Sequence, residues 1–203
     1  MIPFMNFLLA FFFSFIGTIP PGTLNISILQ LGVENKLGMA WRFALAAALV
    51  EYPYAWLAVK FERIITTSPL ILENIQLITA VVMTLLGIFS LWSARRPSRF
   101  SQKFYSSGFR RGLILGVLNP LALPFWLGTT AYLKGQQWIN LTSALELHSY
   151  LFGVSLGALA LLMLLAYLAK KVITKIHDSV LLKVLPGTIL LILGMYAFLQ
   201  FLT

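Results

Sequence analysis

The sequence predicts an all-α integral membrane protein, with six transmembrane helices arranged as two inverted three-helix repeats. Of its 203 residues, 59% are hydrophobic and 10% charged, and the mean hydropathy is +0.88. A soluble domain is roughly 45–50% apolar and about 25% charged. The apolar residues also gather into stretches long enough to span a bilayer, and prolines interrupt two of them, close to half the chain apart.

Six apolar stretches supply the roughly 20 residues that a transmembrane helix needs. Their continuity differs from the alternating pattern of outer-membrane strands. The first lacks a basic leader and a small-residue cleavage site, so we expect a retained helix. Short connections predict one transporter domain over residues 1–203, with repeats at about 1–93 and 109–203 around a basic loop at 94–108. The stretches are 2–31, 38–59, 71–92, 109–133, 150–169 and 181–202.

Basic residues are distributed unequally between the connections. The chain has 15 Lys and Arg against 6 Asp and Glu, a net charge of +9. With six spans, Lys60, Arg63 and Lys134 fall on one side and the other basic residues on the opposite side, which the positive-inside rule makes cytoplasmic. We therefore expect a multi-pass protein of the bacterial inner membrane with both termini outside. These charges face an anionic lipid leaflet, and no soluble basic module points to nucleic acid.

The first and fourth stretches contain helix-breaking motifs. One is Thr18-Ile19-Pro20-Pro21-Gly22-Thr23-Leu24-Asn25, and the other is Leu118-Asn119-Pro120-Leu121-Ala122-Leu123-Pro124. Proline removes a backbone donor and clashes with the preceding turn. Asn119 followed by Pro120 is typical of an N-cap and first helical residue. New half-helices are therefore predicted to start near Pro21 and Pro120.

These breaks predict a central binding site. Transporters built from inverted repeats place their sites where corresponding helices are interrupted near the midplane. In the predicted topology both new half-helices point their N-termini at the membrane centre, where free N–H groups attract an anion such as a carboxylate. The alternative is that the prolines only kink packed helices.

Glu51 lies halfway along the second stretch and is the only acid deep within a predicted span. An ionised side chain there is costly, so it is usually functional. Alanines share its helical face, which directs the carboxyl into the bundle, and Tyr54, one turn away, is expected to bond to it. Pro53 loosens the adjacent backbone. Glu51 is predicted to couple protons or bind an ammonium group; the alternative is a protonated acid that only packs.

Further polar and small residues carry less specific signals. Thr23, Ser27 and Gln30 form a polar stripe that either lines a pathway or bonds neighbouring helices. Gly112-x-x-x-Gly116 and Gly153-x-x-x-Gly157 indicate close helix packing and permit a homodimer.

The sequence shows no arrangement for catalysis. It has no Cys, and His148 and His177 fall at opposite surfaces without a metal-binding spacing. We expect no enzyme activity, no cofactor and no metal site.

The assembled motifs resemble the lysine exporter type of amino-acid efflux proteins, the LysE/RhtB superfamily. Pro21-Gly22, with Thr23 and Asn25, corresponds to a Pro-Gly-Pro-like element in which Thr23 replaces the second proline. Asn119-Pro120 and the acidic Glu51 also match, although the second stretch is alanine-rich instead of glycine-rich. The resemblance covers essentially the whole chain and implies export of amino acids or related small solutes, driven by protons or the membrane potential.

The sequence therefore predicts an exporter that alternates access between two halves. Five residues at the breaks would shape the central site: Pro20, Pro21, Gly22, Asn119 and Pro120. Thr23 and Asn25 would line it, and Glu51 with Tyr54 would bind a charged group or the coupling proton. The alternatives are a metal or inorganic ion exporter of related architecture, for which Glu51 is the one available acid, and a non-transporting membrane assembly factor.

Overall fold

The computed structural model describes residues 2–20, 22–95, 107–119, 121–176 and 180–202. All regular structure in these ranges is helical, which confirms the all-α class. Pro21, Pro120, His177 and most of the basic loop lie outside them. The helices are α1 (Ile2–Gly17), α2 (Thr23–Val33), α3 (Leu37–Thr67), α4 (Pro69–Glu73), α5 (Ile75–Arg95), α7 (Gly108–Val117), α8 (Ala122–Gly135), α9 (Ala144–Ile176) and α10 (Val180–Leu202).

Each predicted stretch corresponds to one helix or one broken pair. The first divides into α1 and α2, and the fourth into α7 and α8, which meet at 64°. Within the described ranges, one helix is long and apolar enough to cross a membrane: residues Ala144–Ala169 of α9. The bent α7–α8 pair is a second candidate if the two helices are counted as one span. The six-span topology stays a prediction.

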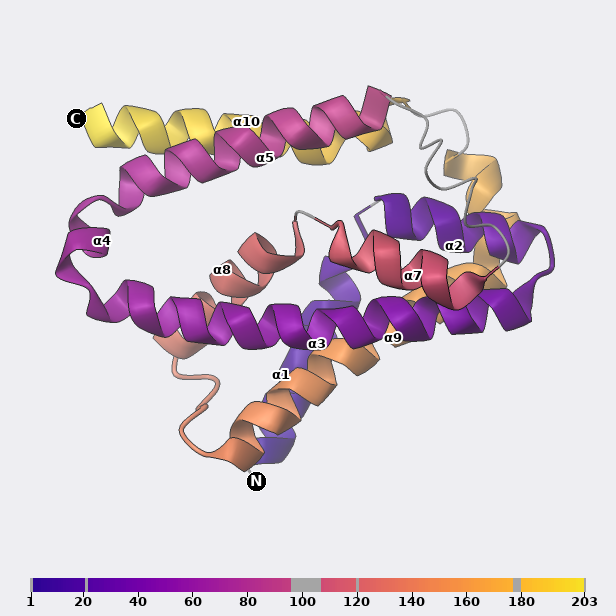
Figure 1. Ribbon diagram of the computed structural model, residues 1–203, viewed down its shortest axis with the longest axis horizontal. Helices are drawn as coiled ribbons and strands as arrows, with labels where there is room; N and C mark the ends of the chain where they lie inside the picture. The colour runs from indigo at the N-terminus through magenta and orange to yellow at the C-terminus, as the bar shows by residue number, and fades with distance from the viewer. Residues whose placement is uncertain (1, 21, 96–106, 120, 177–179, 203) are drawn as a thin grey trace.

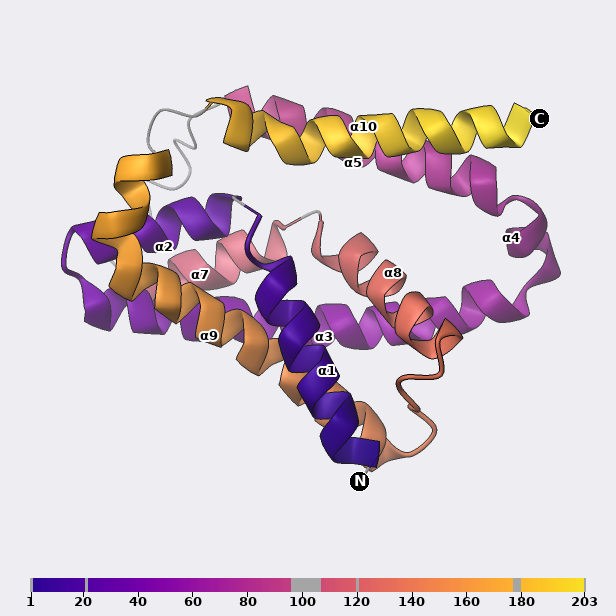
Figure 2. The ribbon, with the colours of Figure 1, turned by 180° about the vertical axis from the view of Figure 1, so that it is seen from behind.

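The helices form a main body and a separate pair. In the body, α9 packs along α1, α2 and α3, and α3 packs along α7 and α8. The antiparallel helices α5 and α10 pack on each other and, apart from α4, make at most sparse contacts with the rest of the described chain (Figures 1 and 2). The body therefore contains both broken helices and the predicted site.

Glycines bring the body helices into backbone contact. A Cβ on Gly112 of α7 would lie 2.2 Å from the carbonyl oxygen of Phe43 on α3, and one on Gly157 of α9 would lie 2.3 Å from that of Phe11 on α1. Only glycine permits this approach. The prediction that both Gly-x-x-x-Gly motifs mark close packing is confirmed.

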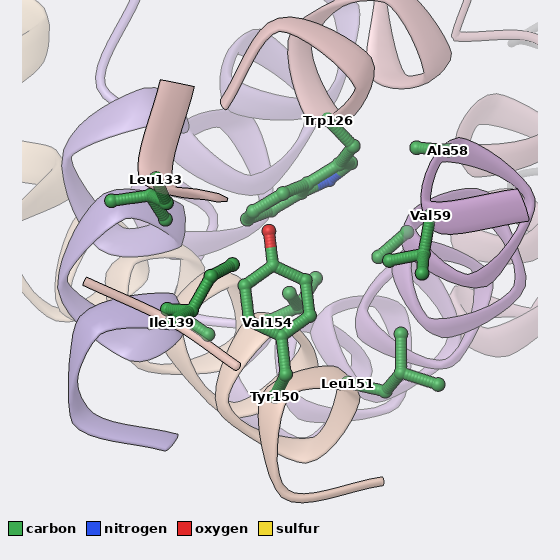
Figure 3. Close-up of a cluster of buried hydrophobic side chains, with 10 residues drawn as sticks. Ala58, Val59, Trp126, Leu133, Ile139, Tyr150, Leu151 and Val154 are labelled. Carbon is green, nitrogen blue, oxygen red and sulfur yellow. The ribbon is translucent and has the colours of Figure 1, made fainter. Parts of the chain in front are cut away.

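Two buried clusters fill the body. One, centred on Phe43, Ile28 and Leu162, joins α2, α3 and α9. The other joins α1, α3, α8 and α9 around Trp126 and Tyr150, whose hydroxyl points toward the indole ring (Figure 3). These rings pack edge to face at 6.2 Å. The second cluster fixes α8 against the middle of α3, where Glu51 lies.

Candidate functional site

The break between α1 and α2 is held by one buried amide. Asn25 donates through Nδ2 to the carbonyl oxygens of Thr18 at 2.6 Å and Pro20 at 3.0 Å, and it contacts that of Ile19 at 3.3 Å. These carbonyls belong to the connection after α1, which ends at Gly17, so they have no partner within a helix. Asn25 supplies their donor and so stabilises the break from within α2.

The start of α2 is more open than its middle. Pro20, Gly22 and Thr23 are exposed, and no atom lies within 4 Å of a Cβ placed on Gly22. Gly22 is the N-cap and offers no side-chain acceptor to the first turn. α2 starts at Thr23, two residues after the predicted Pro21, and no side chain caps it.

The second break forms around Asn119. Its Oδ1 accepts from the Leu121 backbone N–H at 3.3 Å, which is the geometry of an Asx turn. The N-cap of α8 is Leu121, so the predicted N-cap role of Asn119 is wrong. The chain needs this extra turn because α8 leaves α7 at 64°. α8 then starts at Ala122 without a side-chain cap.

The two breaks meet in the structure. Gly17, the last residue of α1, lies under the ring of Phe125, so close that an added Cβ would be 2.1 Å from Cζ. Phe125 packs edge to face on Trp126 at 5.0 Å. Both aromatic residues belong to the first turns of α8. The end of α1 therefore contacts the start of α8.

Glu51 connects α3 to this contact between α1 and α8, which we call the junction and which is formed by Gly17, Phe125 and Trp126. Its Oε2 accepts a hydrogen bond from Trp126 Nε1 at 2.7 Å. Ala48 and Ala55, on the same face of α3, are buried. The prediction that the carboxyl faces the bundle interior is confirmed. The indole donor is neutral, so this hydrogen bond leaves the charge of an ionised Glu51 uncompensated.

Tyr54 does not bond to Glu51, contrary to our expectation. Its hydroxyl donates to the carbonyl oxygen of Val117, the last residue of α7, at 2.6 Å. That carbonyl has no helical partner because α7 ends there. Glu51 therefore contacts α8 and Tyr54 contacts α7, so that α3 bridges the second break.

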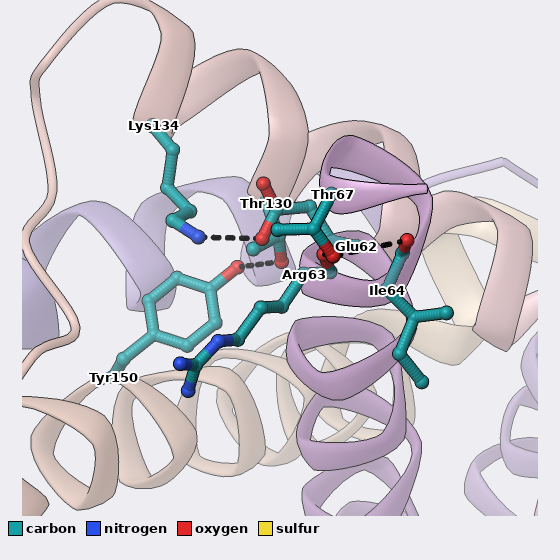
Figure 4. A network of polar contacts seen from close by, with 7 residues as sticks. All are labelled: Glu62, Arg63, Ile64, Thr67, Thr130, Lys134 and Tyr150. Carbon is teal, nitrogen blue, oxygen red and sulfur yellow. Dashed lines mark hydrogen bonds and ion pairs between the residues drawn. The ribbon is translucent and has the colours of Figure 1, made fainter. Parts of the chain in front are cut away.

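A second acid on α3 was missed by the sequence analysis. Glu62 is buried and pairs with Lys134 at the end of α8, with Nζ and Oε2 2.5 Å apart (Figure 4). Beside them the buried hydroxyls of Thr130 and Tyr150 bond at 3.0 Å. The predicted second stretch ends at residue 59, before a charged segment, yet the alanine stripe continued by one turn from Ala58 reaches Glu62.

Ser27 and Gln30 bond to a neighbouring helix. Arg111 of α7 is buried and donates through Nη2 to Ser27 Oγ at 2.9 Å and to Gln30 Oε1 at 3.2 Å. Of the two alternatives for this stripe, the structure shows interhelical hydrogen bonding. It also corrects the assignment of Arg111 to the basic surface: the close packing of Gly108 and Gly112 on α3 places its side chain between helices.

The polar contacts around Arg111 and Gln30 extend into the turn between α2 and α3. Gln30 Nε2 donates to Glu34 Oε1 at 3.1 Å, and Lys36 Nζ lies 2.8 Å from Glu34 Oε2. The hydrogen bond from Lys36 lowers the pKa of the Glu34 carboxyl. A chain of polar contacts thus runs from buried Arg111 to the exposed turn.

His148 lies beside an aromatic residue. Its Nδ1 is 2.5 Å from the hydroxyl oxygen of Tyr52 on α3. Within the described ranges, no three His, Asp or Glu side chains are grouped to hold a metal ion.

Comparison with known proteins finds a matching family model and a similar curated protein. The family model described as LysE type translocator matches residues 15–200. A curated relative from Bacillus subtilis (strain 168), named "Putative amino acid efflux protein YcgF", is 26% identical over 185 residues, covering 87% of each chain. No solved structure matches. Because the family model covers nearly the whole chain, this protein belongs to the LysE type translocators, a family of membrane transport proteins.

Proposed function

We propose that this protein is a secondary active exporter of amino acids or related small zwitterionic solutes, driven by a proton gradient or the membrane potential. Membership of a translocator family supports transport, and the name of the Bacillus relative supports amino acids as the substrate class. The observation that carries the proposal is the junction at which Gly17, Phe125, Trp126 and Glu51 bring both helix breaks beside a half-buried acid.

The junction offers complementary chemistry to a zwitterion. The N-termini of α2 and α8 carry no side-chain cap, so their N–H groups and helix dipoles suit a carboxylate. Glu51 suits the ammonium group, or carries the coupling proton. The proposed substrate binds with its carboxylate toward the breaks and its amine toward α3.

The predicted site residues divide into two roles. Pro20, Pro21, Gly22, Asn119 and Pro120 shape the breaks. Thr23, Asn25, Glu51 and Tyr54 line the site, and Asn25 also holds the first break in place through its amide. Ser27 and Gln30 line a pathway only when their hydrogen bonds to Arg111 are broken. In the proposed cycle, these bonds close the pathway between α2 and α7.

Alternating access between two inverted repeats is supported by the pattern of packing. The broken pair α1–α2 of the first half packs on α9, the helix that follows the break in the second half. The broken pair α7–α8 of the second half packs on α3, the helix that follows the break in the first half. A glycine makes a backbone contact in each pair. A Cβ on Gly32 of α2 would lie 2.2 Å from the Ala166 carbonyl oxygen on α9, and one on Gly112 of α7 would lie 2.2 Å from that of Phe43 on α3. Each broken pair thus packs on an unbroken helix of the other half, an arrangement that suits movement of one half against the other.

The proposed setting is the bacterial inner membrane, with both termini outside and the basic connections facing the anionic cytoplasmic leaflet. The excess of 15 Lys and Arg over 6 Asp and Glu supports this orientation. A homodimer is a further proposal, supported by the exposed apolar faces of α5 and α10.

Uptake into inside-out membrane vesicles tests the proposed function. Labelled L-leucine, L-threonine, L-lysine and L-glutamate are offered under an imposed proton gradient. We expect uptake of at least one, abolished when an ionophore collapses the gradient and the potential, and absent from vesicles without the protein. If none of a full amino-acid panel is transported, the substrate class is wrong.

A further inference from the structure

Two hydroxyl groups, those of Thr130 on α8 and Tyr150 on α9, bond to each other inside the body. Both residues are fully buried, and the two oxygen atoms lie 3.0 Å apart (Figure 4). A valine and a phenylalanine of the same shape would fill this space without the cost of taking two hydroxyl groups out of water. The bond therefore contributes little net stability, and what distinguishes it is the arrangement that it fixes.

Tyr150 also contacts Trp126, the hydrogen-bond donor to Glu51. Its ring meets the indole edge to face, with the centroids 6.2 Å apart and the planes at 85°, and its hydroxyl points toward the indole ring (Figure 3). Thr130 follows Trp126 by four residues and so lies one turn further along the same face of α8. One side chain of α9 thus contacts two successive turns of α8.

The hydrogen bond to Glu51 depends on how the indole of Trp126 is turned. Its one N–H donates to Glu51 at 2.7 Å. The χ2 torsion of a tryptophan has two broad wells, and turning from one to the other carries the N–H to the opposite side of the ring axis. The rotamer preference of Trp126 does not by itself direct this N–H at α3, so the packing of its neighbours must do so.

Two aromatic rings pack against the indole, and one of them comes from a different helix. Phe125 precedes Trp126 on α8 and meets it at 5.0 Å, whereas Tyr150 belongs to α9. The bond to Thr130 holds the Tyr150 ring against α8. Since α9 packs along α1, α2 and α3 as well, a shift of α9 against α8 would move Tyr150 away from the indole.

We propose that Tyr150 and Thr130 are positioning residues for Glu51, which act through the indole of Trp126. The inference rests on the proposed function and deepens it, because it states what regulates the acid of the proposed site. Glu51 has its donor while α8 and α9 are packed as in this structure. When the two helices separate, the indole turns and Glu51 loses the hydrogen bond.

Nuclear magnetic resonance of the ¹⁵N-labelled full-length protein in detergent micelles tests the positioning directly. The chain has five tryptophans, which give five indole N–H resonances, and the Trp126→Phe variant identifies the resonance of Trp126. A hydrogen bond to a carboxylate moves an indole proton downfield. The Glu51→Ala variant therefore marks the position of the Trp126 resonance without its acceptor.

In Tyr150→Phe and in Thr130→Val we expect the Trp126 resonance to move upfield toward its position in Glu51→Ala. Thr130→Ser keeps a hydroxyl and should restore the wild-type position. Tyr132→Phe is the matched control, since Tyr132 is an exposed tyrosine of α8, and it should leave the resonance in place. A Trp126 resonance that stays at the wild-type position in both hydroxyl variants overturns the inference.

The double variant Tyr150→Phe with Thr130→Val separates positioning from stability. Replacing both partners of a buried hydrogen bond by apolar groups of the same shape is nearly neutral for folding. We expect the double variant to unfold at a temperature near that of wild type and still to show the upfield shift. A wild-type resonance position in this folded variant also overturns the inference.

Uptake into inside-out vesicles measures the consequence for Glu51. In the double variant we expect uptake to fall by about threefold to tenfold, which corresponds to one hydrogen bond. Added to Trp126→Phe, the same two substitutions should lower uptake by less than about twofold further, because the indole that they position is already gone. Losses that multiply independently overturn the inference. A wild-type protein that transports no amino acid refutes the proposed function, whereas the indole resonance, measured without transport, still decides the positioning.

Discussion

Single hydrogen bonds hold the candidate site in place. Trp126 Nε1 bonds to Glu51, the hydroxyl of Tyr54 bonds to Val117, and the amide of Asn25 bonds to the carbonyls of Thr18 and Pro20. Two of these donors bind carbonyls left over where a helix ends. A break in a packed helix therefore requires particular polar side chains nearby, and these side chains also belong to the proposed substrate site.

Replacing Asn25 tests this at the first break. Asn25→Ala leaves the carbonyls at the end of α1 without their donor, and a buried unsatisfied carbonyl costs about 1–3 kcal/mol. We expect a lower unfolding temperature in detergent, measured by circular dichroism. Asn74→Ala is the control, since the Asn74 amide bonds to the Leu70 carbonyl in an exposed segment. Equal shifts for the two variants would contradict the role of Asn25.

Replacing Trp126 tests the donor to Glu51. Trp126→Phe keeps an aromatic ring against Phe125 and Tyr150 but removes the N–H. We expect a loss of about 1–3 kcal/mol in the free energy of unfolding, because the half-buried Glu51 carboxyl loses its hydrogen-bond donor, together with reduced vesicle transport. Transport at the wild-type rate would show that the bond to Glu51 is not needed for the transport cycle.

At the scale of helices, small residues determine which elements touch. Alanines cover the face of α3 that bears Glu51, and glycines of α7, α9 and α2 lie directly on neighbouring backbones. Because lipid is as apolar as leucine, close backbone approach, more than apolar burial, holds membrane helices together. The glycines thus fix the position of α7 and α8 relative to α3, and with it the site.

Two Gly→Ala substitutions separate packing from helix propensity. In Gly112→Ala the new Cβ would lie 2.2 Å from the Phe43 carbonyl oxygen, whereas in Gly128→Ala it meets nothing within 4 Å. We expect Gly112→Ala to destabilise by about 1–3 kcal/mol, as overpacking does. Gly128→Ala should be neutral or stabilising by up to about 1 kcal/mol. Thermal unfolding of both variants in one detergent measures this, and the opposite order would contradict the packing.

Sequence patterns predicted the elements better than the contacts between them. The apolar stretches and proline motifs located the helices, and both breaks lie within two residues of prediction, because helix termination is a local property. The partner of Tyr54, the burial of Arg111 and the Glu62–Lys134 pair depend on how distant helices pack. The sequence does not single out Glu62, because it lies among charged residues, although its helical face continues the alanine stripe.

For the whole molecule, the orientation in the membrane follows from the distribution of charge. The chain has no Cys, so single cysteines can be introduced without background. We expect Gln136→Cys, in the connection before α9, to react with a membrane-impermeant maleimide in intact cells. Lys36→Cys, in the α2–α3 turn, should react only after permeabilisation. The reverse labelling would invert the predicted topology.

Glu51 and the two breaks form the centre of the proposed transport mechanism, so the most direct test is amino-acid uptake into inside-out vesicles by wild type and Glu51→Gln under an imposed proton gradient. Glutamine can still accept the hydrogen bond from Trp126 Nε1, and we expect the variant to fold with a similar unfolding temperature. The account predicts gradient-driven uptake by wild type and a loss of at least about tenfold in the variant, equivalent to about 1.4 kcal/mol. Undiminished uptake by Glu51→Gln would contradict it.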